Sequence, residues 1–377
     1  MAGDTATIAA PTSRQSLTLD DFLDTRSAGF DLVRLVLAFL VLVSHTWPLG
    51  GFGSEPVSPL APKVLTLGGF AVGGFFALSG LMVGRSALRR RSGTFAKARF
   101  ARLMPGLWVA MLVSAFVVAL IGWVHRHHAL GGYFTLRPDG PFAYVGRGAT
   151  LPVSFSHGIA DVFTTDTPFG VSSGGSFING SLWTLPYEIR CYLVIGVVAV
   201  VARRYGGRRT ITVAWLLSLA FAIGYAKRVD LTSFLASPYA DRQLAAFLFV
   251  FLTGTLVAAW AHKIRLFGWV PVAALVLAVI AGRSSAFWSE HITQASMAVV
   301  LPPVAALVGP VARVLRGVDL SYGLYLYAWP MQQLVALYHW TSRPATFIVV
   351  STALATTCAA ASWFAIERPS MAWARRR

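Results

Sequence analysis

The sequence has few charged residues for its length. Asp, Glu, Lys and Arg make up 12% of the 377 residues, whereas hydrophobic residues make up 56%. An ordinary soluble domain contains roughly 25% charged residues. The composition therefore excludes an ordinary soluble domain and predicts an integral membrane protein.

Cysteine is also scarce, and the short motifs of several enzyme classes are missing. Cys191 and Cys358 both fall in apolar runs, so we expect buried thiols and no disulfide framework. The chain has no G-x-S-x-G elbow, no P-loop and no dinucleotide fingerprint. The HRHH stretch at 125–128 and His157 do not have the spacing of zinc ligands. We therefore expect no metal site and no bound cofactor.

Acidic residues are outnumbered by basic ones. The chain has 15 Asp and Glu against 32 Lys and Arg, a formal net charge of +17. In a soluble protein this excess would suggest a nucleic-acid partner, but the basic segments show neither aromatic interleaving nor a recognised module. We predict no nucleic-acid binding.

The chain has many apolar runs of about 17 to 22 residues. This is the length that crosses a bilayer as a helix. We predict an all-α bundle of ten transmembrane helices, near residues 30–48, 66–84, 104–124, 183–202, 210–226, 243–261, 266–282, 295–312, 320–338 and 346–366.

The basic residues fix the predicted orientation. Of the 32 Lys and Arg, 21 fall in segments on one side of this topology and nine on the other. The positive-inside rule then places both termini in the cytoplasm, as in a multi-pass protein of a cell inner membrane. We expect a polar, mobile arm over 1–28, a membrane domain over 29–370 with a long external segment at 125–182, and a basic cytoplasmic tail over 371–377.

Two polar residues interrupt the first apolar run. Arg34 and His45 are eleven residues apart, which places them within roughly 20° of each other around a helix and about 16 Å apart along it. Ionisable residues inside a membrane usually face a bundle interior or a wet cavity. The structural alternative is a snorkelling arginine and a packed interfacial histidine.

Glu188 lies in the fourth run. Counted along the helix from the outer end of that run, it lies at nearly the same depth in the membrane as His45. A carboxylate there could orient the imidazole and stabilise its charged form. The alternative is that Glu188 pairs with Arg190 or caps the helix after Pro186, although residues two apart on a helix do not face each other.

Arg99 and Arg102 lie three residues apart at the cytoplasmic mouth of the third run. Such a pair shares one helical face and could grip phosphate in bidentate fashion. The alternative is that these arginines bind no ligand, because the positive-inside rule by itself predicts an arginine-rich cytoplasmic loop. In the second run, Gly69 and Gly73 have the spacing of a close helix contact, and Ser79 could line a pathway.

Taken together, these stretches resemble the acyltransferase 3 family of polytopic membrane enzymes. The resemblance covers residues 28–370 and rests on Arg34 with His45, FFALSGLMVGRS, RFARLMP, NGSLWTLPYE, LSYGLYLYAWP and IERP. One departure is Ala328, because family members often carry histidine at this position.

The resemblance implies an acyl-CoA co-substrate on the cytoplasmic side and an acceptor hydroxyl, most often of a glycan, on the other. Arg34, Arg99 and Arg102, with Ser79, would then bind the donor, and His45 and Glu188 would be catalytic. In the same motifs we assign acceptor binding to Asn179, Trp183, Tyr187, Tyr325 and Trp329, and Gln332 lies nearby.

We therefore predict a membrane O-acyltransferase, most simply an O-acetyltransferase acting on an exopolysaccharide or lipopolysaccharide. His45 would act either as general base on the acceptor hydroxyl or through an acyl-histidine intermediate. The rival predictions are a transporter or flippase, a structural or sensory membrane protein, and acylation of a lipid or small acceptor. The sequence does not separate acetyl from succinyl donors, nor does it give the oligomeric state.

Overall fold

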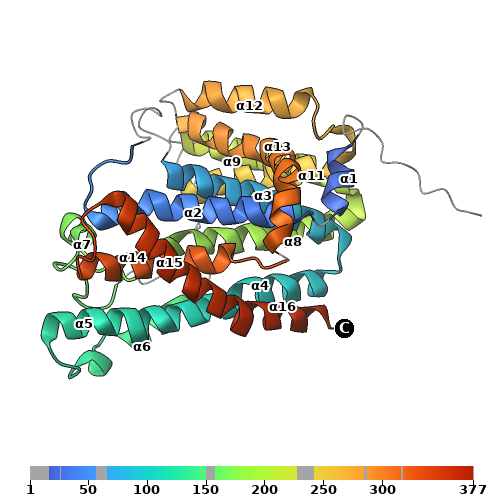
Figure 1. Ribbon diagram of the computed structural model, residues 1–377. Helices are drawn as coiled ribbons and strands as arrows, with labels where there is room; N and C mark the ends of the chain where they lie inside the picture. Colours follow the sequence, from blue (N-terminus) through green and yellow to red (C-terminus); the bar gives the residue numbers. More distant parts are fainter. Residues whose placement is uncertain are drawn as a thin grey trace, which may run out of the picture.

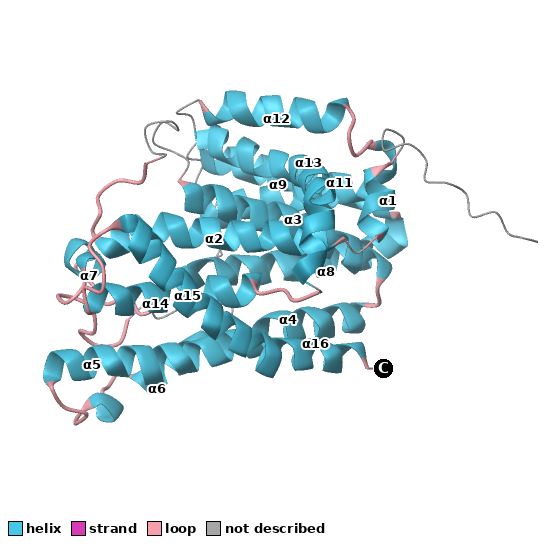
Figure 2. Ribbon diagram, in the orientation of Figure 1, coloured by secondary structure: helices cyan, strands magenta, loops and turns pink. Residues whose placement is uncertain are grey.

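The computed structural model describes residues 17–25, 27–56, 66–149, 158–226, 242–283, 287–315 and 317–376. His157 lies outside these residues. Within them the chain is helical, and the β-bridge between Thr18 and Arg265 is isolated. Figure 2 shows helices connected by loops of varied length, with no strand drawn in this part of the chain. The all-α prediction is confirmed.

The long helices correspond to the ten predicted runs. They are α2 (Ala28–Gly50), α3 (Leu67–Arg89), α4 (Ser92–Val113) continued by α5 (Ala119–His127), α8 (Leu185–Tyr205), α9 (Gly207–Ala226), α11 (Arg242–Ala259), α12 (Trp269–Gly282), α13 (Phe287–Ala312), α14 (Ser321–Leu337) and α15 (Pro344–Ser362). The short helices are α1 (Leu19–Asp24), η3 (Tyr133–Thr135), α6 (Pro141–Ala149), α7 (Pro168–Ser173), η4 (Gly180–Thr184), η5 (Ala261–Lys263), η6 (Arg313–Leu315) and α16 (Arg368–Arg375).

Seven segments of the described chain are long and apolar enough to cross a membrane: Ala28–Gly50, Leu67–Arg89, Ser92–His127, Gly180–Tyr205, Arg242–Ala259, Ser289–Leu315 and Pro344–Arg375. The other three predicted runs hold α9, α12 and α14. For these three a membrane crossing stays a prediction, as does the side on which the termini lie.

The long helices lie side by side, with α2 in the middle of the bundle and α12 along one edge (Figure 1). The central helix α2 packs against α3, α13, α14 and α15. We call the end where α2 begins and α3 ends the basic end, because Arg85, Arg89 and Arg90 lie there. The end where α2 finishes at Gly50 is the distal end.

Glycine allows two of these helices to touch. A β-carbon on Gly80 of α3 would lie 1.9 Å from the Phe251 carbonyl oxygen of α11, and one on Gly254 would lie 2.3 Å from the Ala77 carbonyl oxygen. Close backbone approach through small residues is a common way for helices to pack in membranes. Two turns earlier on the same face of α3, Gly73 lies against the Gln294 side chain of α13, a close helix contact of the kind its spacing predicted.

The predicted mobile arm is instead ordered over part of its length. Residues 19–24 form α1, which is held by a reciprocal capping box between Thr18 and Asp21. Leu19 and Phe22 are buried against the bundle. The Arg85 guanidinium lies 2.8 Å from an Asp20 carboxylate oxygen. The arm was expected to be mobile because its overall polarity concealed these two apolar anchors.

The predicted basic tail, residues 371–377, is helical as far as Arg375, as part of α16. Lys97 of α4 lies 4.5 Å from the centroid of the Trp373 ring and donates to the Arg376 carbonyl oxygen at 3.1 Å. These contacts join α16 to α4.

Two π-helical turns interrupt long helices, η2 (Ser114–Val118) between α4 and α5 and η7 (Trp363–Glu367) between α15 and α16. A π turn holds more residues than an α turn and shifts the direction of the side chains that follow, and such turns are frequent at functional sites. The second one ends at Glu367, which is 1% exposed.

Candidate active site

A cavity of about 610 Å³ opens into the bundle from the basic end. It reaches the exposed side chains of Arg90 and Arg375 and continues along α3 as far as Val72. Those positions on α3 are 18 residues apart, or about 27 Å of helix. Ligand sites in proteins typically occupy about 300–1,000 Å³, so the cavity is large enough for a long, narrow ligand.

The lining changes character along this length. The half nearer the basic end carries Arg34, Arg90, Arg99, Arg102 and Arg375, together with Asp31, Glu188 and Asp319. The distal half is lined by Val72, Phe75, Phe76, Leu78, Thr184 and Tyr325. The cavity therefore suits a ligand with an anionic head and an apolar end.

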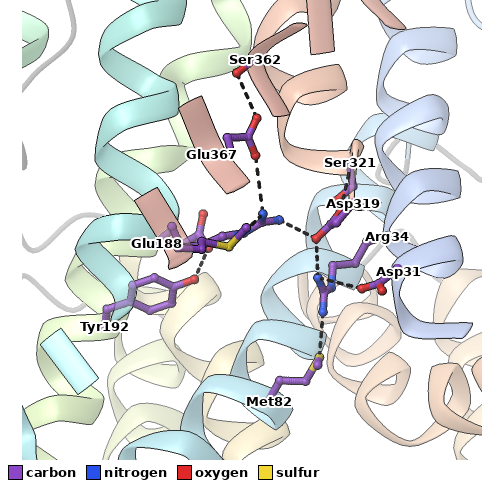
Figure 3. Close-up of polar contacts among 11 residues, drawn as sticks. Asp31, Arg34, Met82, Glu188, Tyr192, Asp319, Ser321, Ser362 and Glu367 are labelled. Atoms are coloured by element: carbon purple, nitrogen blue, oxygen red, sulfur yellow. Dashed lines mark hydrogen bonds and ion pairs between the residues drawn. The ribbon is translucent and has the colours of Figure 1, made fainter. Parts of the chain in front are cut away.

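Asp319, in the connection between α13 and α14, joins two of the arginines (Figure 3). One carboxylate oxygen accepts from Arg34 Nη1 at 2.9 Å and from Arg102 Nη2 at 2.7 Å. The other accepts from the Ser321 hydroxyl at 2.5 Å and the Ser321 N–H at 3.2 Å. A single buried carboxylate thus holds α2, α4 and the start of α14 together.

Burial by itself would raise the pKa of Asp319, but the charges of Arg102 and Arg34 and the hydrogen bonds from Ser321 lower it to about 2. The group therefore stays ionised at every physiological pH, and the two arginines stay partly neutralised.

A second carboxylate lies beside Arg102. Arg102 Nη1 is 3.5 Å from Glu367 Oε2, and the Ser362 hydroxyl donates to Glu367 Oε1 at 3.0 Å. The π turn that ends at Glu367 directs this side chain into the bundle. Arg102, shared between Asp319 and Glu367, is positioned from two sides.

Arg99 differs from these two arginines. It lines the same cavity, and its guanidinium carbon lies 5.9 Å from the centroid of the Tyr192 ring. Its Nε is buried without a hydrogen-bond partner, and it makes no ion pair within the part of the chain that the structure describes. A half-buried guanidinium beside a cavity, with no ion-pair partner among the described residues, favours an anionic ligand.

Glu188 lies in the cavity and not beside His45, which corrects the predicted pairing. Its carboxylate accepts a hydrogen bond from the Tyr192 hydroxyl (Figure 3). Thr184, at the end of η4 one turn before Glu188, contacts Tyr325 of α14, and His45 contacts α14 one turn further toward the distal end, at Trp329. Glu188 and His45 therefore lie at different depths in the bundle.

The reason lies in the segment before α8. Asn179 and Ser181 are fully buried, and the Asn179 amide donates to the Leu326 carbonyl oxygen at 2.8 Å. The chain thus enters the bundle as η4, before α8 begins, and Glu188 lies deeper than a helix starting at the membrane surface would place it.

His45 lies on α2 as predicted, eleven residues beyond Arg34. Its ring meets the edge of Trp329 with centroids 4.8 Å apart, and its buried Nδ1 has no hydrogen-bond partner. The Gln332 amide fixes the surrounding turn of α2, donating to the Leu42 carbonyl oxygen at 2.9 Å and to the Thr46 hydroxyl at 3.0 Å. His45 does not line the cavity.

The five predicted acceptor-binding residues do not form a single cluster. Trp329 meets His45, whereas Tyr325 borders the distal end of the cavity. Trp183 and Tyr187 face α11, where their rings lie 5.8 and 5.6 Å from Phe247. Asn179 uses its amide to anchor η4. Of the five, Trp329 is the one beside the imidazole.

The residues predicted to bind the donor, in contrast, lie together. Arg34, Ser79, Arg99 and Arg102 all line the cavity. Sequence reasoning missed Asp319, which precedes one quoted motif by a residue, and it gave no role to Glu367 or Tyr192. An acidic residue inside a membrane domain was the available signal for Glu367, because such residues are rare unless paired.

Among the described residues, no group of three or more His, Cys, Asp or Glu side chains is arranged to hold a metal ion. At the distal end, His127 and Arg126 bond to Asp161 instead, at 3.3 and 2.6 Å. Both cysteines are free thiols.

The fold defines a multi-pass membrane protein with an internal cavity that is lined by arginines at one end and by apolar side chains at the other. An acyltransferase domain model matches residues 27–364, and the chain belongs to the acyltransferase 3 family. It is 27% identical over 362 residues to Nodulation protein 10 of Rhizobium leguminosarum bv. viciae, covering 91% of this chain and 93% of that protein. It is also 28% identical over 313 residues to the O-acetyl transferase of Shigella phage Sf6, covering 82% of this chain and 86% of that protein.

No solved structure matches the chain at a significant level. With the family assigned and an O-acetyl transferase among its relatives, the chain is an O-acyltransferase. Its apolar helices make it an enzyme of the membrane.

Proposed function

We propose that the enzyme moves an acetyl group from acyl-CoA in the cytoplasm to a hydroxyl of an extracytoplasmic glycan. The observation that carries this proposal is the cavity, which has arginines at its open end and apolar side chains at its closed end. Acyl-CoA has the matching order, with phosphates at one end and a thioester at the other. The relative from Shigella phage Sf6, whose name states O-acetyl transfer, supports the choice of acetyl.

Arg99 is the main phosphate ligand in this proposal, because Arg34 and Arg102 already share the Asp319 carboxylate. Arg90 and Arg375 add positive charge at the open end. Guanidinium groups suit phosphate because their paired N–H groups match two phosphate oxygens. The pantetheine arm then follows the face of α3 that carries Ser79, and the thioester reaches the apolar end.

His45 activates the acceptor. Its imidazole takes the proton of the acceptor hydroxyl as that oxygen attacks the thioester carbonyl, and the C–S bond breaks as the ester C–O bond forms. The imidazolium then returns the proton to the CoA thiolate. In the alternative route, the imidazole attacks first, and the acyl-histidine passes its acyl group to the hydroxyl.

The two routes share one requirement. His45 is separated from the cavity by the turn of α14 between Tyr325 and Trp329, so transfer includes a side-chain movement that joins the two. Glu188 acts on the donor side of this turn, where its carboxylate lines the cavity and accepts a hydrogen bond from the Tyr192 hydroxyl.

The test follows label from radioactive acetyl-CoA into surface glycan in membranes that contain the protein. We expect His45→Ala to abolish incorporation, whereas His125→Ala, at an exposed position of α5, leaves it unchanged. Arg99→Ala removes a charged hydrogen bond worth about 1.5–3 kcal/mol, so we expect the KM for acetyl-CoA to rise roughly 10- to 100-fold. Arg204→Ala, at the same end but outside the cavity, is the matched control.

Robust incorporation by His45→Ala would contradict the role of the imidazole. Label that appears in the lipid fraction and not in glycan would show that the acceptor is a lipid and would contradict the proposed glycan acceptor. Labelled protein in the absence of acceptor, lost in His45→Ala, would select the acyl-histidine route.

A further inference from the structure

The distal end of the cavity is closed by two aromatic side chains. On α3, Phe75 and Ser79 are one turn apart and both half-buried, because this face borders the cavity. The Phe75 ring meets the Tyr325 ring of α14 with centroids 6.0 Å apart and an interplanar angle of 70°. The two rings come from different helices and meet in the apolar half of the cavity, within one turn of Val72, the last lining residue on α3.

Two polar contacts of its hydroxyl group fix the position of the Tyr325 side chain. Its hydroxyl donates to the Ser181 carbonyl oxygen at 2.6 Å and lies 2.6 Å from the Thr184 hydroxyl. All three residues are buried. The closure is therefore anchored to η4, which is itself fixed to α14 through Asn179.

The region beyond the closure is filled. Trp329, one turn further along α14, packs against His45 and against Phe169, whose ring centroid is 5.0 Å away. A β-carbon placed on Gly180 would lie 2.6 Å from the Trp329 ring. The cavity cannot lengthen in this direction without moving these rings.

The residues that line the closed end are also uncharged. Val72, Phe75 and Phe76 offer apolar surface, and the arginines and carboxylates of the lining lie toward the other end. A carboxylate at the tip of an acyl chain would lose its water here and find no cation beside it.

We propose that Phe75 and Tyr325 select the donor by the length and charge of its acyl group, which restricts the enzyme to short, uncharged groups such as acetyl and propionyl. The inference rests on the proposed function, since it places the thioester at the distal end of the cavity. A longer chain meets the two rings and holds the carbonyl back from His45. A succinyl group fits no better, because its carboxylate ends beside Val72 and Phe76.

The experiment compares kcat/KM for acetyl-, propionyl-, hexanoyl- and succinyl-CoA, using membranes with the endogenous acceptor. We expect the wild-type protein to favour acetyl-CoA over hexanoyl-CoA and succinyl-CoA by at least 100-fold. Phe75→Ala should reduce the preference over hexanoyl-CoA at least tenfold, and Phe75→Trp should extend the exclusion to propionyl-CoA. Phe39→Ala, an equal truncation on an exposed face of α2, should leave every ratio unchanged.

Competition by free CoA distinguishes a failure of the acyl-group selection from a failure of the proposed function. CoA lacks an acyl group, so it should displace labelled acetyl-CoA equally from the wild type and from both Phe75 variants, which also shows that the variants are folded. Wild-type use of hexanoyl-CoA at the rate of acetyl-CoA, or unchanged ratios in Phe75→Ala with CoA competition intact, would overturn the selection by Phe75 and Tyr325. Failure of the wild type to bind CoA at all would instead refute the proposed function.

Discussion

Replacing Asp319 by asparagine should both destabilise the protein and strengthen its response to anions. The substitution keeps the size of the side chain but removes the charge that lies 2.9 Å from Arg34 and 2.7 Å from Arg102. Both guanidiniums are then left in the bundle without this partner, and they repel each other.

Two figures bound the loss of stability that we expect for Asp319→Asn. The gap between a pKa of about 2 in the folded protein and the ordinary 3.8 corresponds to about 2 kcal/mol of stabilisation. Removal of one partner from a buried ion pair typically costs about 3–5 kcal/mol. Because water reaches Arg34 and Arg102 through the cavity, we expect a loss between these figures.

The dependence on pH has a definite sign. A carboxylate whose pKa is lower in the folded state contributes its full stabilisation above pH 3.8 and loses it as the pH falls toward about 2. The difference in stability between wild type and Asp319→Asn should therefore be constant from pH 8 to pH 5 and shrink below pH 4.

The assay is thermal unfolding in detergent with and without CoA. We expect Asp319→Asn to melt at a lower temperature and CoA to raise its melting temperature by more than that of the wild type, since the phosphates replace the missing carboxylate. Asp31→Asn is the matched control, because Asp31 lies 3.6 Å from Arg34 and is more exposed, so its loss should cost about 1 kcal/mol or less. Equal melting of wild type and Asp319→Asn, with equal stabilisation by CoA, would refute this reasoning.

Two further substitutions test the framework of the site. Gly80→Ala places a β-carbon 1.9 Å from the Phe251 carbonyl oxygen, so α3 and α11 must separate, and we expect a loss of at least about 1–3 kcal/mol in thermal unfolding; a variant as stable as wild type would show that the contact is not close. Gln332→Leu removes the hydrogen bonds to Leu42 and Thr46 beside His45, so we expect kcat to fall severalfold while the KM for acetyl-CoA is unchanged; a rise in that KM alone would contradict this assignment.

Local patterns in the sequence were sufficient to predict the helices and to place several of the cavity-lining arginines. The apolar runs predict helices because a membrane helix needs about 20 apolar residues wherever it lies in the bundle. Arg34 and His45 share a helix, and Arg99 and Arg102 share a face, so spacing alone places each pair.

Contacts between segments that are distant in the sequence could not be predicted from such local patterns. Asp319 meets Arg34 across 285 positions of sequence, and no periodicity connects them. Glu188 was placed too near the distal end because depth was counted from the start of an apolar run, whereas η4 brings the chain into the bundle first. The arm and the tail were assigned from their polarity, although Leu19, Phe22 and Trp373 provide the contacts that dock them.

The π turn at Trp363–Glu367 has a consequence for variation in this family of sequences. Each α-helical residue turns the chain by about 100°, so the loss of one residue within 363–367 would rotate all of α16 relative to α15. Glu367 would leave Arg102, and Met371 and Arg375 would leave the cavity wall, although no individual side chain had been replaced. Substitutions in this turn should thus be tolerated more readily than a single deletion, and the length of the segment is as much a determinant of the site as its composition.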